Sequence, residues 1–208
     1  MEHRVSAERS YPASKSPLVT RARLDARTRG TRPGTAKLRG VTIGELNGMD
    51  AGAFTDAVGF AFEDSPWIAR AAWAQRPFKD VDDLHRAMTR VVEESSQERR
   101  VALIAAHPDL AGRAAREGRL TASSSGEQRS AGLDRLTAEE FTRFDRLNTA
   151  YRAKFGFPFV ICAREHDKES ILATLDARTR NDRESEIATA LGEIAKIAYL
   201  RLREAISQ

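Results

Sequence analysis

The sequence has 208 residues, of which 41% are hydrophobic and 31% are charged, and its formal net charge is +4. This length suits one domain with or without a tail, and it suffices for a hydrophobic core that needs no disulfide or metal support. The single cysteine, Cys162, excludes an intrachain disulfide framework and a cysteine-cluster zinc site. No run approaches the roughly 18 apolar residues of a membrane span, and we expect neither a membrane partner nor a secretory signal.

The basic charge is concentrated at the N-terminus. Residues 1–40 hold ten Lys/Arg against three acids, a net charge of +7, whereas the remainder holds 24 basic and 27 acidic residues, a net charge of −3. This Arg- and Ser-rich segment has few large apolar residues, so we expect a disordered leader over 1–40 and a domain over 41–208. The leader also fits an organelle transit peptide, a bacterial tail or an overlong start. Because the domain itself is mildly acidic, we expect no nucleic-acid partner for it.

From residue 41 onwards the pattern is helical. Apolar spacing and capping signals predict helices at 43–48, 50–61, 66–75, 80–94, 97–106, 137–155, 168–179 and 183–205. Capping-box spacing begins at Thr42, Ser95 and Thr137, and short helical turns are expected after Asp109 and Gly126. Only 159–163 looks like a strand, and one short run cannot build a sheet. The predicted fold is all-α, a single compact domain of about eight or more helices.

His107 is the histidine best placed for chemistry. It ends the apolar run 101–106 and precedes Pro108, which disfavours helical backbone at the preceding residue. The side chain should therefore project beside buried structure, where an imidazole can act as a general acid or base. The alternative is that it only bonds free carbonyls at the helix end. The other histidines, expected in the leader or at solvated positions, are His3, His85 and His166. None is spaced for a metal, so we expect no metal site.

Arg201 is unusual because it continues an apolar stripe. On the helix predicted at 183–205, the apolar positions step by three or four residues, and the next step reaches Arg201. The stripe consists of Ile187, Leu191, Ile194 and Ala198. A buried guanidinium needs a partner. The alternatives are that Arg201 extends to solvent or interacts with the helix dipole.

Two further segments offer backbone groups. Residues 121–128 place three serines and a glycine before a short helical segment, where free N–H groups attract anions and Glu127 would lie just inside the turn. In 155–164, Gly156 ends a helix and Pro158 keeps the chain extended, which leaves backbone groups without ladder partners. A polar ligand could use both segments, although a capped loop and a tight core connection explain them equally well.

Four motifs can be read together: His-Pro-Asp-Leu-Ala-Gly at 107–112, Ser-Gly-Glu-Gln-x-x-Ala-Gly-Leu at 125–133, Leu-Asn-x-x-Tyr-x-x-Lys-Phe-Gly-Phe-Pro-Phe at 147–159, and Glu-Ile-x-x-Ile-x-x-x-Arg-Leu at 193–202. The His-Pro-Asp-Leu-Ala-Gly and Lys-Phe-Gly-Phe-Pro-Phe stretches are specific in combination. Together the four motifs resemble the 2-oxo-4-hydroxy-4-carboxy-5-ureidoimidazoline (OHCU) decarboxylase family of urate breakdown. The resemblance covers roughly residue 41 to the C-terminus and is weaker before residue 95.

The resemblance implies an all-α, homodimeric, cofactor-free lyase that converts the anionic ureidoimidazoline to (S)-allantoin. It implies that the catalytic residues are His107, Glu127 and Arg201. It implies substrate contacts from Pro108, Ser124, Ser125, Gly126, Gln128, Phe159, Val160, Ile161, Cys162 and Ala163. Two other functions stay open: a non-enzymatic helical interaction module, and nucleic-acid association through 1–40. We expect a cytoplasmic location, because the C-terminus lacks a Ser-Lys-Leu signal.

Overall fold

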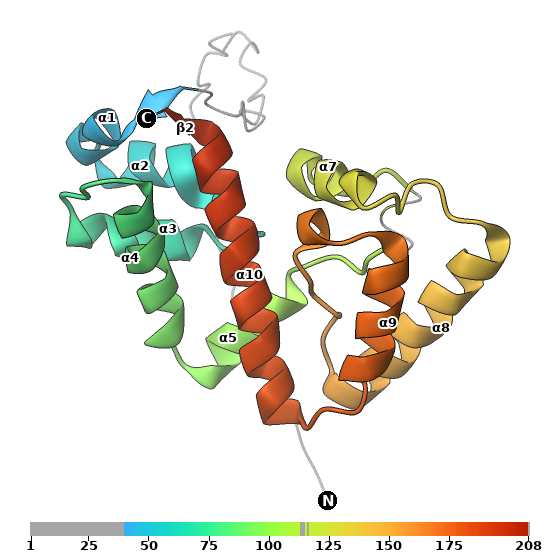
Figure 1. Cartoon of the computed structure of the whole chain (residues 1–208). Helices are drawn as coiled ribbons and strands as arrows, with labels where there is room; N and C mark the ends of the chain where they lie inside the picture. The colour runs from blue at the N-terminus through green and yellow to red at the C-terminus, as the bar shows by residue number, and fades with distance from the viewer. Residues whose placement is uncertain (1–39, 113–114, 116, 208) are drawn as a thin grey trace, which may run out of the picture. The chain divides into compact units, whose positions relative to one another are not determined.

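Helix α10 (Arg183–Ala205) is the longest element and runs between two groups of helices (Figure 1). One group comprises α1 (Ile43–Gly48), α2 (Ala51–Val58), η1 (Gly59–Ala61), α3 (Pro66–Ala72), η2 (Trp73–Gln75), α4 (Val81–Glu93) and α5 (Gln97–Ala105). The other comprises α7 (Ala122–Ser130), α8 (Ala138–Phe155), η3 (Ala163–Glu165) and α9 (Lys168–Arg178). In this computed structural model, the described residues are 40–112, 115 and 117–207, so the expected leader falls outside them except for Gly40. The all-α prediction is confirmed.

Side-chain caps fix most helix starts, as predicted. Thr42 and Thr137 both form capping boxes, with Glu45 and Glu140 respectively. The prediction for Ser95 is wrong, because its hydroxyl donates to the Val92 carbonyl and so closes the preceding helix. The neighbouring residue, Ser96, caps α5 instead.

The strand-like run 159–163 builds no sheet, as predicted. Residues 158–162 are extended but pair with no strand, because polar side chains hold their backbone: Arg178 Nη1 donates to Val160 O at 2.9 Å, and Cys162 N donates to Glu193 Oε2 at 2.8 Å. The strands that do form in the described part of the chain are β1 (Val41–Thr42) and β2 (Ile206–Ser207), which pair in parallel. This pair joins the first described residues to the end of α10.

The start of the helix expected after Gly126 also differs. Helix α7 begins at Ala122 with Thr121 as its N-cap, so the three serines lie inside the helix rather than in a loop before it. Thr121 Oγ1 accepts from Ser124 N, which is the N-cap bond that a threonine makes well. The strong cap therefore moves the start of the helix about four residues upstream, and Glu127 falls in its second turn.

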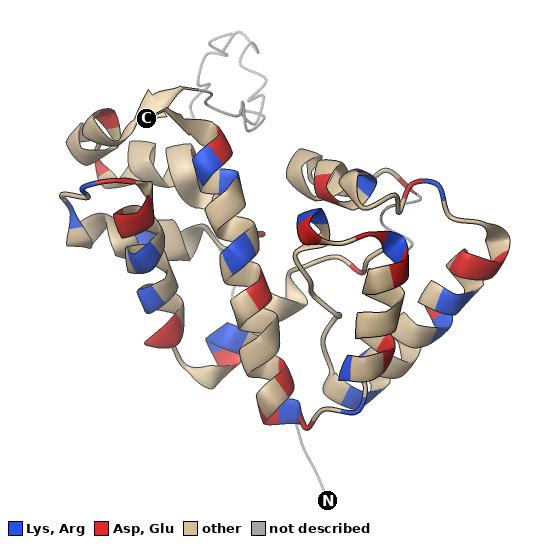
Figure 2. Cartoon of the chain, in the orientation of Figure 1, with Lys and Arg blue, Asp and Glu red and all other residues tan. Residues whose placement is uncertain are grey.

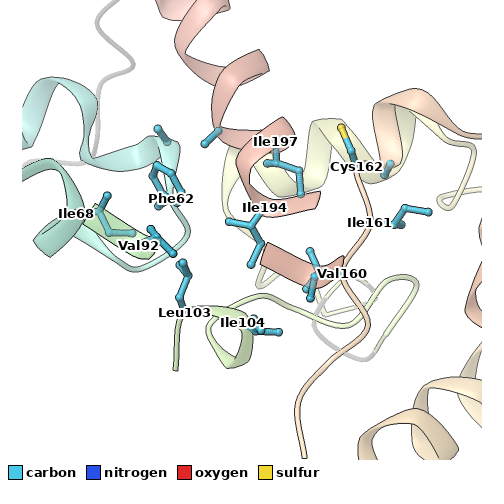
Figure 3. Packing of buried hydrophobic residues seen from close by; sticks show 14 of the residues in the cluster. Phe62, Ile68, Val92, Leu103, Ile104, Val160, Ile161, Cys162, Ile194 and Ile197 are labelled. Carbon is cyan, nitrogen blue, oxygen red and sulfur yellow. The ribbon is translucent and has the colours of Figure 1, made fainter. Parts of the chain in front are cut away.

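The apolar face of α10 packs against both helix groups. Figure 3 shows Ile194 and Ile197 lying between Phe62 and Leu103 on one side and the extended segment on the other. Beneath that segment, four aromatic rings pack with centroids 4.6–6.2 Å apart. They belong to Tyr151, Phe155, Phe157 and Phe159. This packing fixes residues 159–163 beside α10 without any sheet.

Basic and acidic residues are mixed along the helices, as Figure 2 shows for α4, α8 and α10. This agrees with a domain whose charge is close to balanced, as the sequence indicates. Among the described helices, none combines the length and the apolar character that a membrane crossing requires.

Candidate active site

A cavity of about 30 Å³ lies where the end of α5, helix α7, the extended segment and α10 meet. All three residues predicted to be catalytic, His107, Glu127 and Arg201, line it. Predicted substrate-contact residues in the same wall are Pro108, Ser124, Gln128, Phe159, Val160, Ile161 and Ala163. Ser125, Gly126 and Cys162 do not line it. Successive residues of a helix point about 100° apart, so Ser124 faces the cavity while its two neighbours do not.

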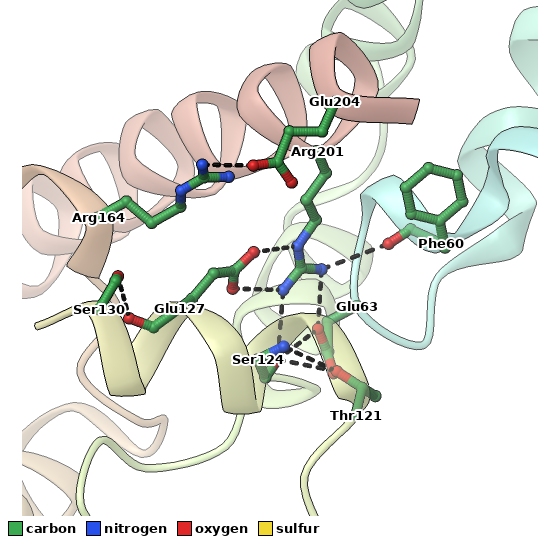
Figure 4. A network of polar contacts seen from close by, with 9 residues as sticks. All are labelled: Phe60, Glu63, Thr121, Ser124, Glu127, Ser130, Arg164, Arg201 and Glu204. Atoms are coloured by element: carbon green, nitrogen blue, oxygen red, sulfur yellow. Dashed lines mark hydrogen bonds and ion pairs between the residues drawn. The ribbon is translucent and has the colours of Figure 1, made fainter. Parts of the chain in front are cut away.

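Arg201 is only 3% exposed, so the alternative in which it extends to solvent is wrong. All five of its N–H donors are used (Figure 4). Glu127 accepts from Nε at 2.7 Å and from Nη2 at 2.8 Å, and Nη2 also lies 3.2 Å from Ser124 Oγ. Nη1 donates to Glu63 Oε2 at 2.9 Å and to the Phe60 carbonyl at 3.3 Å. Burial lowers the pKa of Arg201, but Glu127 and Glu63 outweigh this and raise it.

Glu63 is the residue of this network that the sequence did not reveal. It follows η1, and its side chain is 4% exposed. It accepts from Arg201 and from the hydroxyls of Thr121 and Ser124, each at 2.9 Å. Burial raises the pKa of Glu63, but Arg201 and these hydroxyls together lower it by more. The pKa of Glu63 is therefore below its usual value. The available signal was a charge ending the apolar run 57–62, the same kind of signal that identified His107.

Glu127 binds Arg201 through both carboxylate oxygens, in the fork geometry that suits a guanidinium. Its side chain is 13% exposed, against 4% for Glu63. Arg201 is therefore shared by two carboxylates, one enclosed and one in the cavity wall. The cluster carries one positive and two negative charges.

His107 contacts a carbonyl at the helix end, and its second ring nitrogen stays open. Its Nδ1 lies 3.0 Å from the Leu103 carbonyl, one turn back in α5, and must donate there because a carbonyl can only accept. The neutral ring then presents Nε2 as an acceptor. This atom is buried and has no hydrogen-bond partner among the described residues. Burial lowers the pKa of His107, which favours the neutral ring.

Gln128 offers the complementary group. Its Oε1 accepts from Ala111 N at 3.0 Å, which fixes the orientation of the amide. Its Nε2 is buried and, within the part of the chain that the structure describes, has no partner. Buried polar atoms are nearly always hydrogen-bonded. An open acceptor on His107 and an open donor on Gln128, in one cavity wall, therefore indicate a polar ligand site.

The cavity must widen to take such a ligand. Its volume of about 30 Å³ corresponds to roughly one water molecule, whereas pockets for small organic ligands measure about 300 Å³ or more. The described geometry is therefore that of a closed site with its polar groups already oriented.

One group of described residues outside the cavity wall could hold a metal. The ligand atoms of Glu165, His166 and Glu193 lie within 4.8 Å of one another. Lys196 already bonds both carboxylates, at 3.2 Å and 2.9 Å. The Lys196 ammonium therefore already supplies the positive charge that a metal cation would bring to these two carboxylates.

His85 and His166 lie at the surface but are less solvated than predicted. The His85 ring is half-buried, and Nε2 lies 2.9 Å from the Ala195 carbonyl of α10. His166 is also half-buried, with Nδ1 3.0 Å from Ser170 Oγ. Both contacts tie neighbouring structure together, and neither ring lines the cavity.

The family model of OHCU decarboxylase matches residues 47–203. The chain is 41% identical over 164 residues to the OHCU decarboxylase of Halalkalicoccus jeotgali, covering 79% of this chain and 91% of that protein. It is also 41% identical over 160 residues to the OHCU decarboxylase of Mus musculus, covering 77% and 90%. Among solved structures, an (S)-allantoin synthase superimposes with a TM-score of 0.64 at 30% identity, over 80% of this chain and 54% of that one, about half its length. The chain belongs to the OHCU decarboxylase family.

Proposed function

We propose that this chain decarboxylates OHCU to (S)-allantoin in urate degradation, without a cofactor. Family membership supports the reaction. The location of the active site is supported by two buried polar atoms that have no partner among the described residues, His107 Nε2 and Gln128 Nε2. Both residues line the cavity together with Arg201 and Glu127. An acceptor, a donor, a cation and an anion are the groups that a polar, anionic heterocycle would need.

The substrate supplies its own electron sink. It carries a hydroxyl and a carboxylate on one ring carbon, and the adjacent carbon is part of a ring C=N bond. When the bond to the carboxylate breaks, CO₂ leaves, the electron pair forms a ring C=C bond, and the ring nitrogen takes up a proton. The hydroxyl of this enol then loses its proton and becomes the ring carbonyl. The ureido-bearing carbon gains a proton, and protonation on one face gives a single enantiomer.

The residues around the cavity suit these steps. His107 Nε2 can accept the hydroxyl proton, because the ring is held neutral and its other nitrogen is fixed on Leu103. Gln128 can donate to a substrate oxygen through Nε2. Arg201 stabilises developing negative charge in a buried setting, where charge interactions are strong. Because all five of its donors are engaged, a direct contact with substrate requires an acceptor to release one of them, and Glu127 is the carboxylate among these acceptors that lines the cavity.

The backbone can supply further donors. In the described residues, no hydrogen bond engages the N–H groups of Val160 or Ile161, although both residues line the cavity. The neighbouring Val160 carbonyl and Cys162 N–H are held by Arg178 and Glu193. These anchors keep the segment extended with its open N–H groups beside Arg201, which supports the predicted substrate contacts.

The direct test follows the ultraviolet absorbance of freshly generated OHCU. The full chain should accelerate the decay well beyond the spontaneous rate, and decay at the spontaneous rate would refute the proposed function. A non-enzymatic helical module predicts that second result. A chelator should leave the rate unchanged, because the ring C=N bond accepts the electron pair. A large loss would show that a metal takes part.

We also propose that the chain forms a homodimer, as the family resemblance implies, and that it is located in the cytoplasm. Light scattering should give twice the chain mass of 23.1 kDa. A free thiol at Cys162, buried and with a pKa raised by burial to about 11, suits a reducing compartment. A monomer at micromolar concentration would contradict the first part.

A further inference from the structure

We propose that Glu63 is a positioning residue: it is the permanent counter-ion that keeps Arg201 in place when Glu127 turns to the substrate. The inference rests on the proposed function, because it assigns a role at the same site. Its starting point is the sharing of one guanidinium by two carboxylates from different parts of the chain. Only one of them, Glu127, lines the cavity.

The contacts distinguish the two carboxylates. Glu63 is satisfied on both oxygens by protein donors: Thr121 on Oε1, and Arg201 together with Ser124 on Oε2. Among the described residues, the Glu127 carboxylate accepts hydrogen bonds from Arg201 alone. A carboxylate with three donors and 4% exposure is hard to move, whereas one with a single partner in a cavity wall can exchange it. Glu63 therefore keeps its bond to Arg201, whereas Glu127 can exchange its bonds to Arg201 for contacts with the substrate.

The charge balance explains why two carboxylates are needed. If Glu127 were the sole partner, moving it towards the substrate would leave a buried, uncompensated guanidinium, which is strongly unfavourable. With Glu63 fixed at Nη1, the cation stays compensated and its Nε and Nη2 edge becomes free for an anionic oxygen. Glu63 also links the segment after η1 to two helices. Thr121 and Ser124 belong to the start of α7, and Arg201 belongs to α10 (Figure 4).

The test compares Glu63→Gln and Glu63→Asp with wild type in the OHCU assay. Glu63→Gln keeps the shape and leaves Arg201 paired with Glu127, so the variant should fold. We expect kcat to fall roughly 10- to 100-fold, the range for losing a hydrogen bond to a charged group, while KM does not rise, because a negative charge has left an anion site. Glu63→Asp restores the charge and should recover part of kcat. The matched control is Glu139→Gln, an exposed carboxylate in the first turn of α8, which should behave as wild type.

A pH profile separates positioning from simple structural support. Thr121→Val removes one hydrogen bond to the charged form of Glu63, which raises the pKa of Glu63 and should move the acid limb of kcat to higher pH. Thr121→Ser keeps the hydroxyl and should not move it. The other charged or titratable groups around Glu63 are Arg201, Glu127 and His107. Among the described residues, the Thr121 hydroxyl bonds Glu63 and Ser124 and none of these three.

The outcomes are distinct. If OHCU decays only at the spontaneous rate in the presence of the wild-type chain, the proposed function fails and the role of Glu63 fails with it. If wild type is active and Glu63→Gln keeps its kcat, or loses activity only through a higher KM, the inference about Glu63 alone is overturned. An acid limb that is the same in Thr121→Val and Thr121→Ser would also overturn it.

Discussion

Two buried arginines, Arg201 and Arg178, are each held by a carboxylate, yet they lie in different settings. Arg178 binds Glu186 through Nε and Nη2 and the Val160 carbonyl through Nη1. Glu186 is fully buried and also accepts from Tyr151 and Asn181. This cluster has one cation and one anion, and Arg178, Glu186 and Tyr151 do not line the cavity. It connects α8, α9 and α10 to the extended segment.

The cluster around Arg201 is also buried but has an excess of negative charge, and it borders a cavity with open polar atoms. A closed, balanced cluster can only support structure. An unbalanced one beside unsatisfied groups can respond to a ligand. The difference shows that burial of a charge does not identify a site; the balance and the open partners around it do.

The largest expected effect concerns the open acceptor. His107→Ala should reduce kcat by roughly 10²- to 10⁴-fold, the usual contribution of a general acid or base. The helical circular dichroism should be unchanged, because His107 lies beyond the last residue of α5. Full activity in a folded variant would exclude His107 from the reaction and leave the Arg201 side of the cavity as the reactive part.

The second-largest effect is expected on stability, at the balanced cluster of Arg178 and Glu186. Arg178→Ala leaves Glu186 buried without its cation, and breaking a buried pair in this way lowers the free energy of unfolding by about 3–5 kcal/mol. Denaturant unfolding measures this directly. Arg146→Ala, an exposed arginine of α8, is the control and should change stability by less than about 0.5 kcal/mol. An Arg178→Ala variant as stable as this control would show that the Arg178–Glu186 cluster does not stabilise the fold.

A smaller effect is expected at the open donor. Gln128→Glu keeps an oxygen for Ala111 N but replaces the Nε2 donor with an acceptor, next to an anionic substrate. We expect KM to rise roughly 10- to 100-fold, with a smaller change in kcat. Steady-state kinetics would decide, and an unchanged KM would show that Gln128 Nε2 does not meet the substrate.

The smallest effect is a pH dependence of stability. The folded state lowers the pKa of His107 below its ordinary value of 6.5 through burial. The unfolded chain therefore binds the proton first as the pH falls through 6.5, and the folded state loses stability over that window. Unfolding at pH 7.5, 6.5 and 5.5 should show this slope in wild type and a shallower one in His107→Ala. Equal slopes would mean that the ring is already protonated or exposed.

Local signals in the sequence were sufficient for the helices and for part of the site. Capping residues and apolar spacing located the helices described here to within a few residues, apart from the start of α7. Two polar residues that interrupt an apolar pattern, His107 and Arg201, were visible for the same reason. Both lie in the cavity wall.

Long-range contacts were not accessible in this way. Glu63 bonds Arg201 across 138 positions, and no periodicity connects them. The pairing of β1 with β2 is only two residues long, too short for a sequence pattern. The segment 159–163 has the composition of a strand, but Arg178 holds its Val160 carbonyl and Glu193 holds its Cys162 N–H in place of a neighbouring strand. In each case a tertiary partner decided the outcome.

The most direct test of the central claim is the stereochemistry of the product. Protonation in solution occurs equally from both faces of the planar intermediate, whereas a closed cavity with fixed donors exposes one face. Circular dichroism of the allantoin formed by the wild-type chain should show the (S)-enantiomer in excess, at a rate above the spontaneous decay. Racemic allantoin formed at the spontaneous rate would contradict the account.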